Sequence, residues 1–379
     1  MNKKLMIIAG EASGDLHGAA LIKKLKNIDS SLEILGIGGD RMIDAGMIAL
    51  FHIKKMAFLG LVEVIKHIPF IKQVQKKLIN TVVEEKIKII ILIDYPGFNL
   101  DIAKKFKKLG RKIIYYISPQ IWAWGKRRIK KIKKYVDRMI VVFPFEEKLY
   151  NENGINAVYV GHPLIEHIEN YNFITKNELY EKFNLTKGKE ILLLLPGSRK
   201  HEIKKIFPET IKAASLLADN FNLQIVVACA DNINENIFYN LSNNKNYKII
   251  KGHTYDLLKY SYFGIIKSGT STLEAGFFQL PFIVVYATNF LTYLIGRLVV
   301  QIDSIAMVNI LLEEKVIEEL IQSEMNSENI YEKSFEILSD KKKYNELKDK
   351  LMMLKSKLGN SGASEKAAKI IYSILNEAQ

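Results

Sequence analysis

Short, almost continuously apolar runs recur along the chain, and each is followed by a longer amphipathic segment. Runs that are apolar at nearly every position, instead of at alternate ones, indicate strands covered on both faces, as in a parallel sheet between helices. The runs occupy residues 5–9, 32–37, 88–93, 112–117, 139–143, 190–195, 224–228, 264–267 and 282–286. This alternation predicts an α/β fold wound with right-handed crossovers.

The alternation lapses once, about midway along the 379 residues. The lapse includes His162 and the polar stretch 166–177, where we place a linker. On each side, the pattern predicts a Rossmann-like, doubly wound domain, with a cleft between the two. No strand signal follows residue 313. The predicted parts are residues 1–165, residues 166–340 and closing helices over residues 341–379.

The chain is strongly basic. Lys and Arg outnumber Asp and Glu by 55 to 41, which gives a net charge of +14. Such a surplus favours an anionic partner, whether a nucleic acid, an acidic membrane surface or a phosphorylated substrate. A compositional bias toward Lys, Ile and Asn is the simpler alternative.

Two features bear on where the protein works. Cys229 is the only cysteine, so no disulfide can form within the chain and a reducing cytoplasm is expected. Residues 275–296 are uncharged and long enough to cross a bilayer, but Gln279, Pro281 and Thr288 interrupt them. We therefore expect no membrane-spanning helix there.

An apolar stripe in the first half is unusually wide for a surface helix. It covers residues 58–71 and includes Phe58, Leu61 and Ile65. The stripe predicts either contact with a membrane or a helix pair packed on its own domain.

A basic amphipathic segment follows Trp122 and Trp124. Seven of the nine residues 126–134 are cationic, while the apolar ones keep helical spacing. Tryptophan rings and lysines together are typical of helices that lie on an anionic membrane surface. A solvated basic face is the alternative. The lysines expected to contact the membrane are Lys130, Lys131 and Lys134.

Several familiar sites are missing from the sequence. It contains no P-loop, and the turn after the first predicted strand, residues 10–15, lacks the dinucleotide-binding glycine pattern. Without His-Glu-x-x-His, Cys-x-x-Cys or Asp-x-Asp patterns, neither a metal site nor a cofactor is expected. In an open parallel sheet the turn after a strand faces the ligand crevice, so Gly10, Ser13 and Gly14 are candidates to line it.

Asp94 is the candidate catalytic residue. It follows the apolar run 88–93, and a carboxylate at the carboxyl end of a buried strand is well placed to act as a general base. The alternative is that Asp94 caps a helix beginning near Phe98, although Pro96 and Gly97 intervene.

Two loops in the second half are suited to bind phosphate. In the first, the backbone amides near Ser198 and the planar guanidinium of Arg199 can bind phosphate oxygens; a turn with a solvated arginine is the alternative. The second loop leads into a helix whose amino terminus suits a diphosphate. Its candidates are Ser268, Gly269, Thr270 and Ser271.

Glu274 lies in the predicted first turn of that helix, where it could reach a ribose diol. The alternative is a capping box, in which Ser271 is the helix cap and Glu274 its partner.

Six motifs, in order along nearly the whole chain, together resemble those of the lipid-A-disaccharide synthase family. They occupy residues 9–15 (AGEASGD), 93–99 (IDYPGFN), 118–124 (SPQIWAW), 161–164 (GHPL), 195–199 (LPGSR) and 268–274 (SGTSTLE). The resemblance implies a metal-independent, inverting GT-B glycosyltransferase on the cytoplasmic face of the inner membrane. It would join UDP-2,3-diacylglucosamine to 2,3-diacylglucosamine 1-phosphate (lipid X), releasing UDP. A homodimer is implied, and no nucleic acid partner.

The resemblance also assigns roles to residues. Asp94 matches the proposed catalytic aspartate of the family and would take the proton of the acceptor hydroxyl. Arg199, Glu274 and Asn309 match nucleotide-site positions, although Val308 stands where a proline is common. His162 is a candidate for the cleft, with a structural role as the alternative.

Three other interpretations remain open at this point. One is another UDP-sugar GT-B enzyme, such as the lipid II glycosyltransferase or a UDP-N-acetylglucosamine 2-epimerase. A nucleic-acid-binding protein would explain the charge but not the loops of Asp94 and Glu274. A non-catalytic module at the membrane surface is the third.

Overall fold

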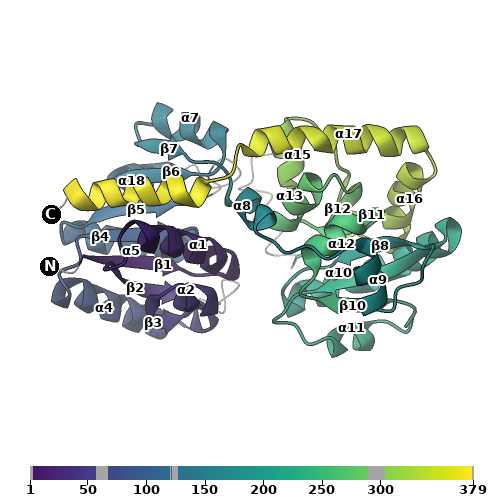
Figure 1. Cartoon of the computed structure of the whole chain (residues 1–379), viewed down its shortest axis with the longest axis horizontal. Helices are drawn as coiled ribbons and strands as arrows, with labels where there is room; N and C mark the ends of the chain where they lie inside the picture. Colours follow the sequence, from purple (N-terminus) through teal and green to yellow (C-terminus); the bar gives the residue numbers. More distant parts are fainter. Residues whose placement is uncertain (1–2, 57–66, 120, 122–126, 289–303, 378–379) are drawn as a thin grey trace. The chain divides into compact units, whose positions relative to one another are not determined.

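The computed structural model describes residues 3–56, 67–119, 121, 127–288 and 304–377. It divides the chain into two compact units. Unit 1 comprises Met1–Glu166 and Leu358–Gln379, and unit 2 comprises His167–Lys357. Each unit has a parallel sheet flanked by helices (Figure 1), which confirms the predicted α/β class.

Unit 1 contains a seven-stranded parallel sheet of order β3-β2-β1-β4-β5-β6-β7. Its strands are β1 (Lys4–Ala9), β2 (Glu33–Gly38), β3 (Met47–His52), β4 (Ile89–Ile93), β5 (Lys112–Tyr116), β6 (Arg138–Val141) and β7 (Ala157–Tyr159). No apolar run predicts β3 or β7. Both are edge strands that bury only part of their length, so neither needs a continuous apolar sequence.

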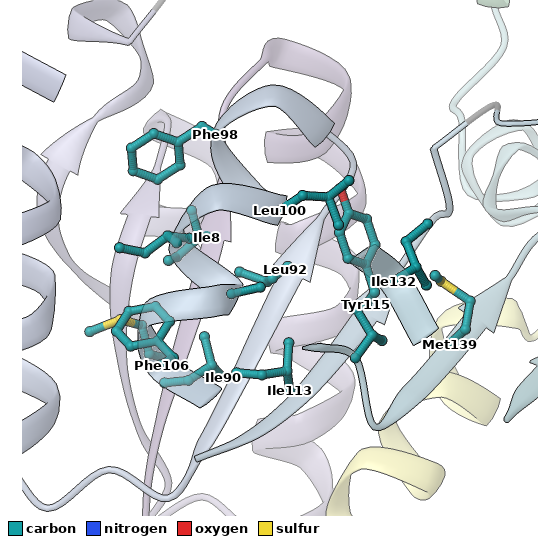
Figure 2. Packing of buried hydrophobic residues seen from close by; sticks show 14 of the residues in the cluster. Ile8, Ile90, Leu92, Phe98, Leu100, Phe106, Ile113, Tyr115, Ile132 and Met139 are labelled. Atoms are coloured by element: carbon teal, nitrogen blue, oxygen red, sulfur yellow. The ribbon is translucent and has the colours of Figure 1, made fainter. Parts of the chain in front are cut away.

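The core of unit 1 forms where helices cover the sheet. Met6 and Ile8 of β1 pack in one layer with Leu78, Phe106 and Ile132, which come from three different helices. Figure 2 shows Ile8, Phe106 and Ile132 of this layer, with Leu92 and Tyr115 among them. The helices of the unit are α1 (Ala12–Ile28), α2 (Asp40–Asp44), α4 (Ile68–Glu84), α5 (Pro96–Lys108), α6 (Arg127–Tyr135), α7 (Pro144–Glu152), α8 (Pro163–Glu169, which crosses the unit boundary) and α18 (Ala363–Glu377).

Helix α18 completes unit 1 from far along the chain. It packs against α1, and Ala367, Ala368 and Ile371 are buried on its inner face. The Tyr372 hydroxyl donates a hydrogen bond to Asp29 at 3.0 Å, just after α1 ends. The sequence predicts helices in this region but gives no sign of which domain they join.

Unit 2 contains a six-stranded parallel sheet of order β10-β9-β8-β11-β12-β13. Its strands are β8 (Glu190–Leu195), β9 (Leu223–Cys229), β10 (Lys248–Lys251), β11 (Phe263–Lys267), β12 (Phe282–Tyr286) and β13 (Glu319–Ile321). The expectation that strands stop after residue 313 is therefore wrong. β13 is a three-residue edge strand and β10 has four residues, and both are too short to form a recognisable apolar run.

Helices cover the sheet of unit 2 on both faces (Figure 1). Phe207 from the longest of them packs with Phe238 and Tyr247 in the core, at ring distances of 5.0 Å and 5.6 Å. The helices are α9 (Lys176–Lys182), α10 (Lys200–Phe221), α11 (Asn236–Leu241), α12 (Thr254–Tyr260), α13 (Thr270–Phe277), α15 (Met307–Leu312), α16 (Ser327–Leu338) and α17 (Lys341–Leu358).

Strand register decides which loops meet. In unit 1, Ala9 pairs with Ile93, so the loops that follow β1 and β4 leave the sheet side by side. In unit 2, Ile266 pairs with Leu195 and Lys267 pairs with Val285. The loops after β8, β11 and β12 therefore share one edge.

If α18 is part of the unit 1 core, Ile371→Ala should destabilise the sheet of that unit. Removing a fully buried isoleucine side chain costs about 2–5 kcal/mol. Hydrogen exchange of the β1 and β4 amides should speed up, while the β8 and β11 amides of unit 2 keep their protection. Lys366→Ala, at an exposed position of the same helix, is the control. Unchanged exchange in β1 and β4 would contradict the assignment of α18 to this core.

Candidate active site

Asp94 lies between β4 and α5, in an unusual backbone conformation. Its φ is +44° and that of Tyr95 is +49°, so two successive residues with side chains occupy the left-handed region. Such residues cost conformational energy and persist only where surrounding contacts hold them. Helix α5 begins at Pro96, two residues earlier than expected, and its cap is Tyr95. Asp94 therefore precedes the cap position, contrary to the capping alternative.

Two fully buried side chains hold the Asp94 backbone. The carbonyl oxygen of Asp94 accepts a hydrogen bond from Asn99 Nδ2 at 2.7 Å and another from the Tyr115 hydroxyl. The Asp94 amide donates to the Tyr116 carbonyl at 3.2 Å. Sequence reasoning gave neither Asn99 nor Tyr115 a role. The available signal for Asn99 was a polar residue among the apolar positions of α5.

The carboxyl group of Asp94 is an unusually strong base for an aspartate. Burial, and next the negative charge of Glu11, raise its pKa to about 6, although a hydrogen bond from the Tyr95 amide opposes the shift. A carboxyl whose pKa is close to neutral is a more effective general base than an ordinary one and remains largely ionised at pH 7. Glu11, the residue before α1, is a second contributor that sequence reasoning missed.

Gly10 and Gly14 serve packing. A Cβ at Gly10 would lie 2.2 Å from the Tyr95 ring, and one at Gly14 would lie 3.2 Å from the Cβ of Ala9. The space beside Gly10 is thus filled by Tyr95, whose hydroxyl donates to the Met56 carbonyl at 3.0 Å. Ser13 is half-buried in the first turn of α1.

His162 is buried by structural contacts within unit 1. Its Nδ1 accepts a hydrogen bond from the Leu164 amide at 3.1 Å, which requires the proton on Nε2 in the neutral ring. Its backbone amide donates to the Leu358 carbonyl at 3.2 Å, and its ring lies 5.0 Å from that of Phe143. These contacts favour the structural alternative for His162.

The loop after β8 surrounds a buried carboxylate. Arg199 is the cap residue of α10, and its Nη1 lies 3.5 Å from Oε1 of Glu202. Lys267 Nζ lies 3.0 Å from the same oxygen. Ser198, by contrast, is exposed. Sequence reasoning missed Glu202 and Lys267, although a charged residue at the end of an apolar run was a signal for Lys267.

The hydroxyl groups of the second loop bond to the protein backbone. Ser271 Oγ donates to the Lys267 carbonyl at 3.2 Å, and Ser268 Oγ donates to the Ile305 carbonyl at the same distance. The cap of α13 is Gly269, with a φ of +153°, so the capping box of Ser271 and Glu274 is wrong. The backbone amides at Gly269 and Thr270 begin the helix, as expected for an anion site.

Glu274 lies in the second turn of α13, one turn later than expected. Burial raises its pKa to about 7, and the Tyr255 hydroxyl, which donates to Oε1 at 3.4 Å, opposes the shift. Near neutral pH the group therefore exists in both forms, so it can donate or accept a hydrogen bond.

Both polar atoms of the Asn309 side chain are engaged in hydrogen bonds within unit 2. Its Nδ2 donates to the Ile317 carbonyl and to Glu319, both at 2.8 Å. Its Oδ1 accepts from the amides of Val316 and Ile317. To bind a nucleotide, Asn309 would have to give up one of these bonds, so the contacts favour a role in holding the turn before β13.

Helix α6 has the predicted amphipathic form. Ile132 is buried, whereas Lys130, Lys131 and Lys134 are exposed. Phe58, Leu61, Ile65, Trp122 and Trp124 lie outside the described residues. A surface cavity of about 380 Å³ between α5 and α6 is lined by Lys104, Lys107, Lys108, Lys134 and Tyr135.

Two absences among the described residues bear on metals and membranes. Across the described ranges, no group of three or more His, Cys, Asp and Glu residues is arranged to hold a metal ion. In the same part of the chain, no helix combines the length and apolar character needed to cross a membrane.

A comparison with models of protein families identifies the family of this chain. The family model described as lipid-A-disaccharide synthetase matches residues 5–373. The chain belongs to the lipid-A-disaccharide synthase family. A lipid-A-disaccharide synthase of Geobacter sulfurreducens is 36% identical over 377 residues, covering 99% of this chain and 98% of the relative. That of Syntrophus aciditrophicus is 37% identical over 383 residues, and both chains are fully covered.

Solved structures agree with this family at the level of the fold. An S. aureus MnaA–UDP structure superposes with a TM-score of 0.70 at 16% identity, covering 99% of this chain and 97% of that one. The calicheamicin glycosyltransferase CalG4 gives a TM-score of 0.62 at 12% identity, with 99% of each chain covered. The predicted GT-B fold is thereby confirmed.

The raised pKa of Asp94 can be measured directly by carbon NMR of its carboxyl group. The resonance should titrate near pH 6, and Glu11→Gln should lower that pKa because it removes a nearby negative charge. Glu274, in unit 2, is the internal control and should titrate near pH 7 in both proteins. An Asp94 pKa near the ordinary value of about 4 would contradict the burial described here.

Proposed function

We propose that the protein transfers the 2,3-diacylglucosaminyl group of UDP-2,3-diacylglucosamine to the 6-hydroxyl of 2,3-diacylglucosamine 1-phosphate (lipid X). The products are the β-1,6-linked disaccharide 1-phosphate and UDP. Membership of the lipid-A-disaccharide synthase family makes the chain a glycosyltransferase and supports this substrate pair. The observation that carries the catalytic part is the buried carboxyl group of Asp94, with its pKa of about 6, on a backbone fixed by hydrogen bonds.

Asp94 acts as the general base. It takes the proton from the 6-hydroxyl of the acceptor as that oxygen attacks the anomeric carbon, while the bond from this carbon to UDP breaks on the opposite face. The configuration is therefore inverted. Asn99 and Tyr115 support this role because they fix the backbone from which the carboxylate projects. A positioned general base contributes roughly 10²–10⁴-fold to such a step.

Unit 2 binds the donor. Negative charge grows on the β-phosphate of UDP as it departs, and Arg199 and the backbone amides that begin α13 stabilise this charge. Glu274 hydrogen-bonds the ribose hydroxyls, which both its protonated and its ionised form can do. The burial of Glu274 and its position on α13 support this assignment.

The protein works at an anionic membrane surface, on the cytoplasmic face of the inner membrane. Both substrates carry acyl chains that partition into a bilayer, so an enzyme that acts on them has to reach the membrane surface. The exposed lysines of α6 support this docking. We further propose a homodimer, as the resemblance to the family implies.

The decisive assay incubates the protein with UDP-2,3-diacylglucosamine and lipid X and detects the disaccharide by mass spectrometry. Asp94→Asn should reduce turnover by roughly 10²–10⁴-fold with little change in UDP affinity, because it removes the base but not the donor site. In the wild type, kcat/KM should fall as pH drops below about 6, where Asp94 becomes protonated.

UDP-N-acetylglucosamine is the comparison substrate. If the protein epimerises it and forms no disaccharide, the proposed function is wrong.

Docking through α6 can be tested by vesicle sedimentation. Changing Lys130, Lys131, Lys133 and Lys134 to Gln should reduce binding to anionic vesicles, because each lysine near such a surface contributes about 1 kcal/mol. The control changes four exposed lysines of α17, Lys341, Lys342, Lys343 and Lys348, to Gln, which lowers the net charge equally. Equal loss of binding in both variants would contradict a specific role for α6.

A further inference from the structure

Three neighbouring strands of unit 2 end in, or lead to, charged or polar side chains. Arg199 follows β8, Lys267 ends β11 and Tyr286 ends β12. Because Ile266 pairs with Leu195 and Lys267 with Val285, these residues emerge at one edge of the sheet. This is the edge at which an open parallel sheet binds its ligands.

The carboxylate of Glu202 is paired with both Lys267 and Arg199. Glu202 projects from the first turn of α10 and is almost fully buried. Its Oε1 lies 3.0 Å from Lys267 Nζ and 3.5 Å from Arg199 Nη1. Its Oε2 lies 2.7 Å from where a Cβ would stand at Gly197, so the absence of a side chain there makes room for the carboxylate. The three charged side chains together carry a net charge of +1.

The ammonium group of Lys267 is held in a restricted place. Its Nζ lies 5.7 Å from the centre of the Tyr286 ring and 3.7 Å from where a Cβ would stand at Gly269. It is therefore beside the first residues of α13. A cation near a helix amino terminus is electrostatically unfavourable, because the helix dipole is positive there, and an anion bound between them would remove the conflict.

Lys267 also has donors to spare. An ammonium group carries three N–H donors. Across the described parts of unit 2, Lys267 forms its ion pair with Glu202, and one carboxylate oxygen at 3.0 Å does not occupy all three donors. The lysine side chain is only 17% exposed, so a ligand that reaches it would be partly shielded from water.

We propose that Lys267 is a second cation that binds the diphosphate of the donor, and that Glu202 positions Lys267 and Arg199 for this purpose. The inference rests on the proposed function and adds to it a binding residue and a positioning residue. Arg199 supplies a planar fork and Lys267 a compact point charge, a combination suited to the several oxygens of a diphosphate. The alternative is that Lys267 only neutralises buried Glu202.

Calorimetric titration of the full chain with UDP and with uridine separates these roles. Lys267→Met should weaken UDP binding about 10-fold to 100-fold, the usual loss for a charged hydrogen bond. Uridine binding should not change, because uridine has no phosphate. Lys267→Arg should retain part of the UDP affinity, which also shows that the site is still folded. Lys248→Met, at an exposed position on β10, is the charge-matched control and should bind both compounds as the wild type does.

The double variant Glu202→Gln/Lys267→Met distinguishes phosphate binding from neutralisation. If Lys267 binds phosphate, the double variant should remain weak for UDP. Wild-type UDP affinity in the double variant, or in Lys267→Met alone, would overturn the inference and leave the proposed function intact. Failure of the wild type to bind UDP would overturn both.

Discussion

The register of the parallel strands is the constraint on which both candidate sites depend. Since all strands in each sheet run the same way, their carboxyl ends open at a common edge, and a shift of one residue would move each loop away from its neighbour. In unit 1 the pairing of Ala9 with Ile93 brings Glu11 within electrostatic reach of Asp94. In unit 2 the same principle brings Lys267 to Glu202.

Three buried carboxyl groups lie near these edges, and each has different surroundings. Asp94 is shielded from water and lies near another negative charge, and both effects raise its pKa. Glu274 is shielded, with one weak hydrogen bond from Tyr255, and its pKa approaches neutrality. Glu202 is paired with two cations. Environment, more than residue type, therefore sets how readily Asp94 and Glu274 take up a proton.

The α/β class and most central strands could be predicted, because strands covered on both faces must be apolar throughout. The same rule could not predict edge strands such as β3, β7 and β13, because they are short or half-exposed. Asp94, Arg199 and Glu274 could be proposed as site residues because they stand at strand ends or in recognisable motifs. Tyr115 and Glu202 could not be predicted, because their contacts join separate elements of the fold. The hydrogen bonds that occupy the side-chain amide of Asn309 have no signature in the sequence either.

The discontinuity of unit 1 has a consequence for how the protein is made. Unit 2 is one uninterrupted stretch of chain, whereas unit 1 needs α18, which the ribosome produces after the whole of unit 2. During synthesis the second unit can therefore reach its native state before the first one is complete. Until then the surface of α1 that α18 covers stays open to water and to other nascent chains, a period when chaperone binding would be most useful.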